Sequence, residues 1–278
     1  MKVLKQLLNF YLDASIHVAL SVYALSLITL KEFGVLYDEN VLYFIFYASI
    51  TGYNFVKYFG VAKFHHRSLT NWLKVIQVFS FVCFVLMCFY GLRLNKVTML
   101  CIVGFGAITF FYAIPFLPNK YFMDRQHNLR SVSGLKIYLI ALVWGGVTVF
   151  LPLINNGYPV DVDVIVTAVQ RFIFIMALML PFEIRDLRYD SLKLSTVPQK
   201  IGEKQTKLLG VLLLGLMFFL EFFKDETSWE FIVSLLVVSI VTGLFVLFSK
   251  KEQGKYYSSF WVEGLSVFWL GLLFFLLK

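Results

Sequence analysis

Nine stretches of mostly apolar residues divide the chain, and each is long enough to cross a bilayer as a helix of about 20 residues. They cover residues 14–30, 41–59, 72–92, 97–117, 135–154, 163–182, 207–223, 229–249 and 258–277. None shows the period-two alternation of barrel strands, and backbone amides in lipid must be paired within the segment. The pattern therefore predicts an all-α integral membrane protein with nine transmembrane helices.

Residues 1–12 have a different pattern, in which the apolar positions gather on one side. Leu4, Leu7, Leu8 and Tyr11 fall on one face of a helix. This arrangement predicts a short amphipathic helix that lies on the membrane surface before the first span. No soluble domain or long linker interrupts the rest of the chain, so we expect residues 1–278 to form a single polytopic membrane domain.

Composition and charge support the same class of protein. The 278 residues are 59% hydrophobic and 15% charged, with a mean hydropathy of +0.78, whereas soluble domains contain about 25% charged residues. With a cytoplasmic N-terminus and nine spans, 19 of the 25 Lys and Arg residues fall in cytoplasmic segments and five in external ones. We therefore expect a multi-pass cell (inner) membrane protein with an external C-terminus. The net charge of +8 then reports this topology, and no nucleic-acid partner is expected.

Three of the 17 acidic residues follow the sixth apolar stretch. Glu183, Asp186 and Asp190 would share one face of a continuous helix. Crowded carboxylates repel one another unless a cation lies among them, and Mg²⁺ typically binds one or two carboxylates together with water and phosphate oxygens. A solvated helix end at the membrane surface would explain the same cluster, although cytoplasmic ends are usually basic.

The segment Glu183-x-x-Asp186-x-x-x-Asp190, followed by Thr-Val-Pro-Gln-Lys-Ile-Gly at 196–202, resembles the second aspartate-rich motif of the UbiA superfamily of intramembrane prenyltransferases. Glu183 stands at the first aspartate position of that motif. The stretch from Tyr112 to Lys120, at the end of the fourth apolar segment, resembles a second family feature, in which a tyrosine precedes a proline and a basic residue.

The resemblance implies nine helices around a central cavity that opens to the cytoplasm. It also implies a reaction in which an isoprenyl group passes from its diphosphate to an aromatic or lipid acceptor, with Mg²⁺ as the cofactor. The metal and catalytic residues implied are Glu183, Asp186 and Asp190. The substrate-binding candidates are Asn54, Lys57, Arg67, Tyr112 and Lys120.

The first aspartate-rich motif of the family, expected after the second span, is degenerate in this chain. Asn54 fits its asparagine position, but Phe55, Tyr58 and Ala62 replace its carboxylates. One reading keeps a single Mg²⁺ site at the second motif, with Lys57 and Arg67 contacting the diphosphate. Another reading is a protein with reduced or lost activity that binds a prenyl lipid or quinone. Ordinary positive charge of a cytoplasmic loop also explains the two basic residues.

Arg171 lies in the middle of the sixth stretch, where charged side chains are rare and usually face the bundle interior. Asp13 and Glu263 are the acidic partners that we expect for it. A small-solute transporter is a third functional hypothesis. It ranks last because the sequence shows no convincing internal repeat and no pair of interrupted spans.

Overall fold

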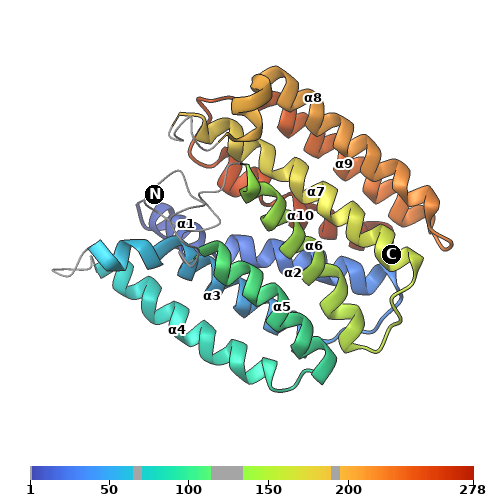
Figure 1. Ribbon diagram of the computed structural model, residues 1–278, viewed down its shortest axis with the longest axis horizontal. Coiled ribbons are helices and arrows are strands. Elements are labelled where there is room, and N and C mark those ends of the chain that lie inside the picture. The colour runs from blue at the N-terminus through green and yellow to red at the C-terminus, as the bar shows by residue number, and fades with distance from the viewer. Residues whose placement is uncertain (1, 65–70, 114–133, 189–194) are drawn as a thin grey trace, which may run out of the picture.

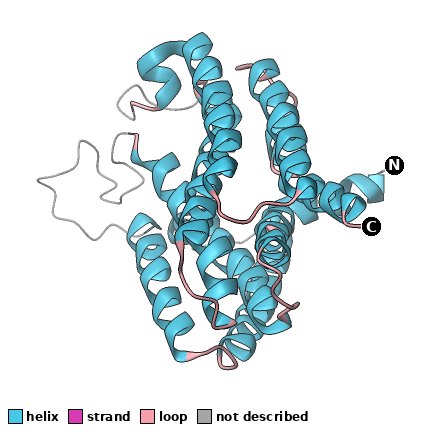
Figure 2. Ribbon diagram, turned by 90° about the vertical axis from the view of Figure 1, so that its right-hand side faces the viewer, coloured by secondary structure: helices cyan, strands magenta, loops and turns pink. Residues whose placement is uncertain are grey.

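The computed structural model describes residues 2–64, 71–113, 134–188 and 195–278, and all regular structure within these ranges is helical (Figures 1 and 2). The α-helices are α1 (Lys2–Asp13), α2 (Ile16–Glu32), α3 (Glu39–Phe64), α4 (Asn71–Gly91), α5 (Lys96–Ala113), α6 (Leu135–Asn155), α7 (Val162–Asp186), α8 (Val197–Leu220), α9 (Trp229–Phe248) and α10 (Leu265–Leu276). A 3₁₀ turn, η4 (Glu221–Phe223), follows α8, and a π-helical segment, η5 (Tyr257–Val262), precedes α10.

Each predicted apolar stretch coincides with a helix or, for the last stretch, with η5 and α10. Six helices of the described ranges are long and apolar enough to cross a membrane, or seven if the bent pair α1–α2 is one span. These helices support a multi-pass membrane protein, but the count of nine spans is not confirmed. The described part of α5 is short, and α3 carries several polar residues, among them Tyr53, Asn54 and Lys57.

The helices pack mainly against their neighbours in sequence, and α10 closes the bundle by returning to α2 and α9. In Figure 1, α7 runs through the middle of the molecule and α4 lies at its edge. The burial of the helices agrees, because α7 is the most buried candidate span and α4 the least. Polar groups on α7 therefore lie in the interior of the bundle, whereas α4 exposes an apolar surface suited to lipid.

The chain turns sharply between α1 and α2. The two helix axes differ by 58°, and Ser15 at the break has a positive φ of 59°. Phe10 packs its ring edge-on against Trp72 and Phe79 of α4, while Leu4 and other apolar residues of α1 remain exposed. This combination suits a helix that lies along the membrane surface.

Gly145 allows α6 and α7 to approach closely. A Cβ atom at this position would lie 3.3 Å from the backbone nitrogen of Phe172 and 3.5 Å from the carbonyl oxygen of Ala168. These contacts are with backbone, which cannot turn away as a side chain can. Small residues at helix crossings are a general means of close packing in membrane proteins.

We expect Gly145→Leu to destabilise the bundle by about 1–3 kcal/mol, because the added side chain forces α6 and α7 apart. The measurement is thermal unfolding of the purified protein in detergent. Gly215→Leu in α8 is the control, since a Cβ there meets no atom within 4 Å. Equal melting temperatures for the two variants would contradict this account of the α6–α7 contact.

Candidate functional site

The last turn of α7 carries two of the three predicted metal ligands. Glu183 and Asp186 are three positions apart and lie on the same side of the helix. The helix ends at Asp186, with Leu187 as its C-cap. Asp190 itself lies outside the described residues.

Lys136, in the first turn of α6, joins these two carboxylates. Its Nζ lies 3.2 Å from Oε1 of Glu183 and 3.4 Å from Oδ2 of Asp186. Glu183 is buried, whereas the side chains of Lys136 and Asp186 remain partly accessible. Sequence reasoning did not identify Lys136, because its proximity to α7 depends on how α6 and α7 pack.

Arg185, the residue before Asp186, also contacts it. Its Nη2 and Nε lie 2.8 and 2.9 Å from Oδ1 of Asp186, so both nitrogens contact the same carboxylate oxygen. The guanidinium lies 5.3 Å from the ring centre of Phe182. Both oxygens of Asp186 therefore have cationic partners, one from α6 and one from α7 itself.

The Thr-Val-Pro-Gln-Lys-Ile-Gly part of the motif has a structural role at the start of α8. The backbone nitrogen of Thr196 donates to Oε1 of Gln199 at 3.1 Å, and Pro198 occupies the first turn. Gly202 has a positive φ of 82° and marks a kink in the helix. Only glycine adopts such a conformation without strain, which explains this residue of the motif.

The residues at the first motif hold the break between α1 and α2. Asn54 is buried; its Oδ1 accepts a hydrogen bond from Ser15 at 2.7 Å, and its Nδ2 donates to the carbonyl of Ala14 and the hydroxyl of Ser80. Lys57 and Tyr58 donate to the carbonyl of Asp13 at 3.0 and 2.9 Å. Because its amide is fully engaged, Asn54 acts as a structural residue in this conformation.

Glu263 connects the two motif regions electrostatically. It interacts with Lys57 of α3 and with Arg185 of α7. The described part of the site is thus a network of opposite charges. Its members are Lys57, Glu263, Arg185, Asp186, Lys136 and Glu183.

The other substrate-binding candidates are not described in this structure. Arg67 and Lys120 lie outside the described residues. Tyr112 belongs to α5, but its side chain is not described.

Glu183 and Asp186 fit one hard cation, because a single ammonium group already lies within 3.4 Å of an oxygen from each. The described residues contain no group of three or more His, Cys, Asp or Glu side chains that would hold a metal ion. The positions of the first motif do not fit a metal, since Phe55 has no ligand atom and Lys57 would repel one. The described side chains therefore suit one metal ion at α7 and none at α3.

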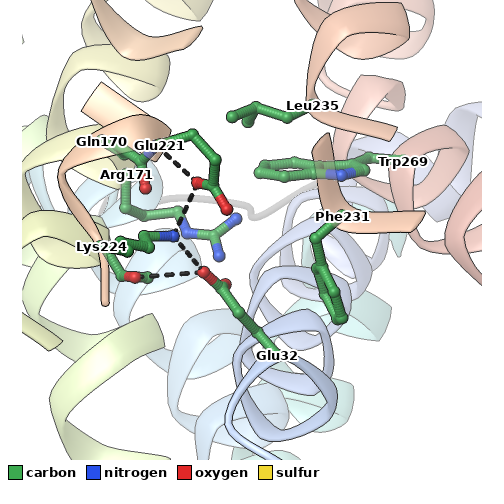
Figure 3. Close-up of a pocket in the computed structure, with 9 residues that line it drawn as sticks. Glu32, Gln170, Arg171, Glu221, Lys224, Phe231, Leu235 and Trp269 are labelled. Atoms are coloured by element: carbon green, nitrogen blue, oxygen red, sulfur yellow. Dashed lines mark hydrogen bonds and ion pairs between the residues drawn. The ribbon is translucent and has the colours of Figure 1, made fainter. Parts of the chain in front are cut away.

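A second cluster of charges surrounds Arg171, about 18 Å along α7 from Glu183. Figure 3 shows the side chains of Arg171, Lys224, Glu32 and Glu221 converging on a pocket beside Trp269. Lys224 forms ion pairs with Glu32 and, at 2.8 Å, with Glu221. Arg171 interacts electrostatically with the same two acids, Glu32 and Glu221. This corrects the sequence prediction, which had paired Arg171 with Asp13 or Glu263.

The surrounding contacts hold this cluster together. The hydroxyl of Thr167 donates to Glu32 at 3.1 Å, and the amide of Gln170 donates to Glu221 at 2.9 Å. Burial lowers the pKa of Lys224, but the attraction of Glu32 and Glu221 outweighs it and raises the pKa above its ordinary value. Lys224 is therefore protonated.

Arg171 is buried with its guanidinium 4.8 Å from the ring centre of Trp269. Its Nη2 lies 3.4 Å from the hydroxyl of Thr29, whereas Nε and Nη1 have no hydrogen-bond partner among the described residues. With two acids and two bases, the cluster has no net charge. It joins α2, α7 and η4 and thus acts as a clamp at the end of the bundle away from Glu183.

The arrangement as a whole defines a helical membrane protein with a charged site at one end of its central helix. No protein-family model and no curated protein sequence matches the chain. Among solved structures, digeranylgeranylglyceryl phosphate synthase superposes with a TM-score of 0.54 and 15% identity, covering 98% of this chain and 97% of the other. A UbiA homologue from Archaeoglobus fulgidus superposes with a TM-score of 0.47 and 12% identity, covering 97% of this chain and 94% of the other.

The similarity to the synthase extends over nearly the whole chain and, at 15% identity, establishes a shared fold. The helical membrane fold that the resemblance implied is therefore shared with a solved membrane synthase.

We expect Glu221→Gln to destabilise the protein by about 3–5 kcal/mol, because it leaves the buried charge of Lys224 with one carboxylate fewer. Thermal unfolding in detergent measures the effect. Glu252→Gln makes the same change in an exposed pair with Arg188, at 3.5 Å, and should cost less than about 1 kcal/mol. A Glu221 variant as stable as the Glu252 variant would show that the clamp does not hold the helices together.

Proposed function

We propose that the protein is a UbiA-type membrane prenyltransferase, which transfers an isoprenyl group from its diphosphate to an aromatic or lipid acceptor. The observation that carries this proposal is the pair Glu183 and Asp186, held at the end of α7 beside Lys136 and Arg185, in a chain that shares the fold of digeranylgeranylglyceryl phosphate synthase. We place this end of the bundle at the cytoplasmic side, with the N-terminus cytoplasmic and the C-terminus external. The distribution of Lys and Arg residues supports that orientation.

In this proposal, Glu183 and Asp186 hold one Mg²⁺, with Asp190 as a further ligand. The ion, when bound, would stabilise the negative charge that develops on the leaving diphosphate. The ammonium of Lys136 and the guanidinium of Arg185 bind the phosphate oxygens nearest the carboxylates. Lys57, Arg67, Tyr112 and Lys120 contact the rest of the substrate head, and the apolar bundle receives the isoprenyl tail in a central cavity.

The chain departs from a two-metal site in a way that limits this chemistry. Tyr58 supplies a hydroxyl donor where the family pattern has a carboxylate, and the neighbouring Lys57 supplies a cation. Both contact the carbonyl of Asp13. Direct contact of such donors with the diphosphate would replace one of the metals. A release of Lys57 from Asp13 is then needed before it contacts substrate.

A second candidate function follows from the same contacts. In this alternative, the side chains of Asn54, Lys57 and Tyr58 keep their hydrogen bonds at the α1–α2 break, and the protein binds a prenyl lipid or quinone without catalysis. The full engagement of the Asn54 amide favours this alternative. Both functions include binding of an isoprenoid, and they differ in whether the protein turns its substrate over.

We expect Asp186→Asn to lower the rate of prenyl transfer by at least about 100-fold, because a neutral amide neither holds Mg²⁺ nor pairs with Arg185. The assay follows diphosphate release from allylic diphosphates of several lengths, with Mg²⁺ and a set of aromatic and lipid acceptors. Glu252→Gln, at an exposed position, should keep the full rate. An unchanged rate in the Asp186 variant would contradict the proposed role, and binding of every diphosphate without turnover would favour the non-catalytic function.

A further inference from the structure

The carboxylates of Glu183 and Asp186 lie close enough to share one cation. Their charges repel each other strongly in an interior of low polarity, and Glu183 is 3% exposed. An uncompensated pair at this depth would be costly. The protein supplies the compensating charge itself, through Lys136 of α6 and Arg185 of α7.

The two cations take different places around the pair. Arg185 binds Oδ1 of Asp186 alone, whereas Lys136 contacts Oε1 of Glu183 and Oδ2 of Asp186 together. Lys136 is thus the bridging cation, and its Nζ lies where an ion shared by these two oxygens would lie. A second cation bound to the same two oxygens would be within a few ångströms of Nζ and strongly repelled by it.

Lys136 has the freedom to leave this position. Its side chain is 29% exposed, compared with 4% for Glu183, and it ends in a flexible four-carbon stem. A groove lined by Gly134, Tyr138 and Lys200 adjoins the same turn of α6. The ammonium can therefore move without unfolding the helix that carries it.

We propose that Lys136 is the resident counter-cation of the Glu183–Asp186 pair, and that a divalent metal binds there only by displacing its ammonium. The lysine thereby lowers the affinity of the site for metal and keeps the carboxylates paired when no metal is bound. This inference rests on the proposed function only in taking a divalent metal as the competing ion. It identifies a residue of the fifth apolar stretch, remote from both motifs in sequence, as the control on metal occupancy.

The size of the effect follows from the distances. An opposite charge within about 4–6 Å of a carboxylate changes its affinity for a competing cation by roughly ten- to a thousandfold. The measured distances of 3.2 and 3.4 Å are shorter than this range. Removal of the ammonium should therefore raise the metal affinity by at least about tenfold.

The test is binding of Mn²⁺ to the detergent-solubilised protein, followed by the electron paramagnetic resonance signal of the free ion, without any prenyl substrate. Lys136→Met keeps the length of the side chain and should bind Mn²⁺ at least about tenfold more tightly than the wild type. The added change Glu183→Gln should abolish this gain, which locates the ion. Lys207→Met, which removes a lysine paired with Glu203 on α8, should alter the affinity less than about twofold.

An unchanged or weaker affinity in Lys136→Met would overturn the proposal, as would a gain that survives Glu183→Gln. If Lys136→Met fails to give a monodisperse protein, Lys136→Gln carries the same test with the same expected gain. Because no prenyl substrate is present, these results are independent of turnover. A failure of prenyl transfer would count against the proposed enzyme function. It would not change the conclusion that the Mn²⁺ binding measurements give about Lys136.

Discussion

Compensation of charge inside an apolar bundle is the constraint on which the rest of this structure depends. α7 is the most buried candidate span, yet it carries Arg171, Glu183 and Asp186. Charges in such surroundings persist only when they are paired or bound to ions. Each end of α7 therefore draws oppositely charged side chains from other elements, and these contacts determine how the elements meet.

The two ends of α7 use this constraint differently. Around Arg171, the partners come from α2 and from η4 and the residue after it, and the pocket beside them has room for roughly one water molecule. This end is suited to holding helices together. At Glu183, the pairing cation is a partly exposed lysine on a flexible stem, which contacts one buried and one partly exposed carboxylate. A site whose counter-ion is exchangeable is suited to binding a ligand.

The α1–α2 break adds a second constraint on the site. Tyr58 stands where the family pattern has a carboxylate, Asn54 keeps the pattern's asparagine, and Lys57 lies between them. Here the three side chains bind the backbone at 13–14 together with Ser15 and Ser80. The loss of carboxylates is thus accompanied by a new set of contacts. α1 is held against the same end of the bundle as Glu183. The position of α1 and the positions of these three α3 side chains therefore depend on each other.

Hydrophobic runs predicted the helix limits well where polar residues flank the run on both sides. For example, α4 lies within a residue of the expected 72–92. α8 begins at Val197, before the expected 207. The apolar run did not include its first turns because they are polar. Spacing along α7 placed Glu183 and Asp186 on one side, but it could not reveal Lys136, Glu263 or the partners of Arg171. Those contacts depend on which helices lie side by side, and a single helical pattern does not contain that information.

The most direct test of the central claim is a structure of the protein with Mn²⁺ and a non-reactive isoprenyl thiodiphosphate. The account predicts one metal ion bound by Glu183 and Asp186, with the ammonium of Lys136 moved to the diphosphate and no ion beside Asn54. A diphosphate bound away from α7, or a metal site that excludes Glu183 and Asp186, would contradict it.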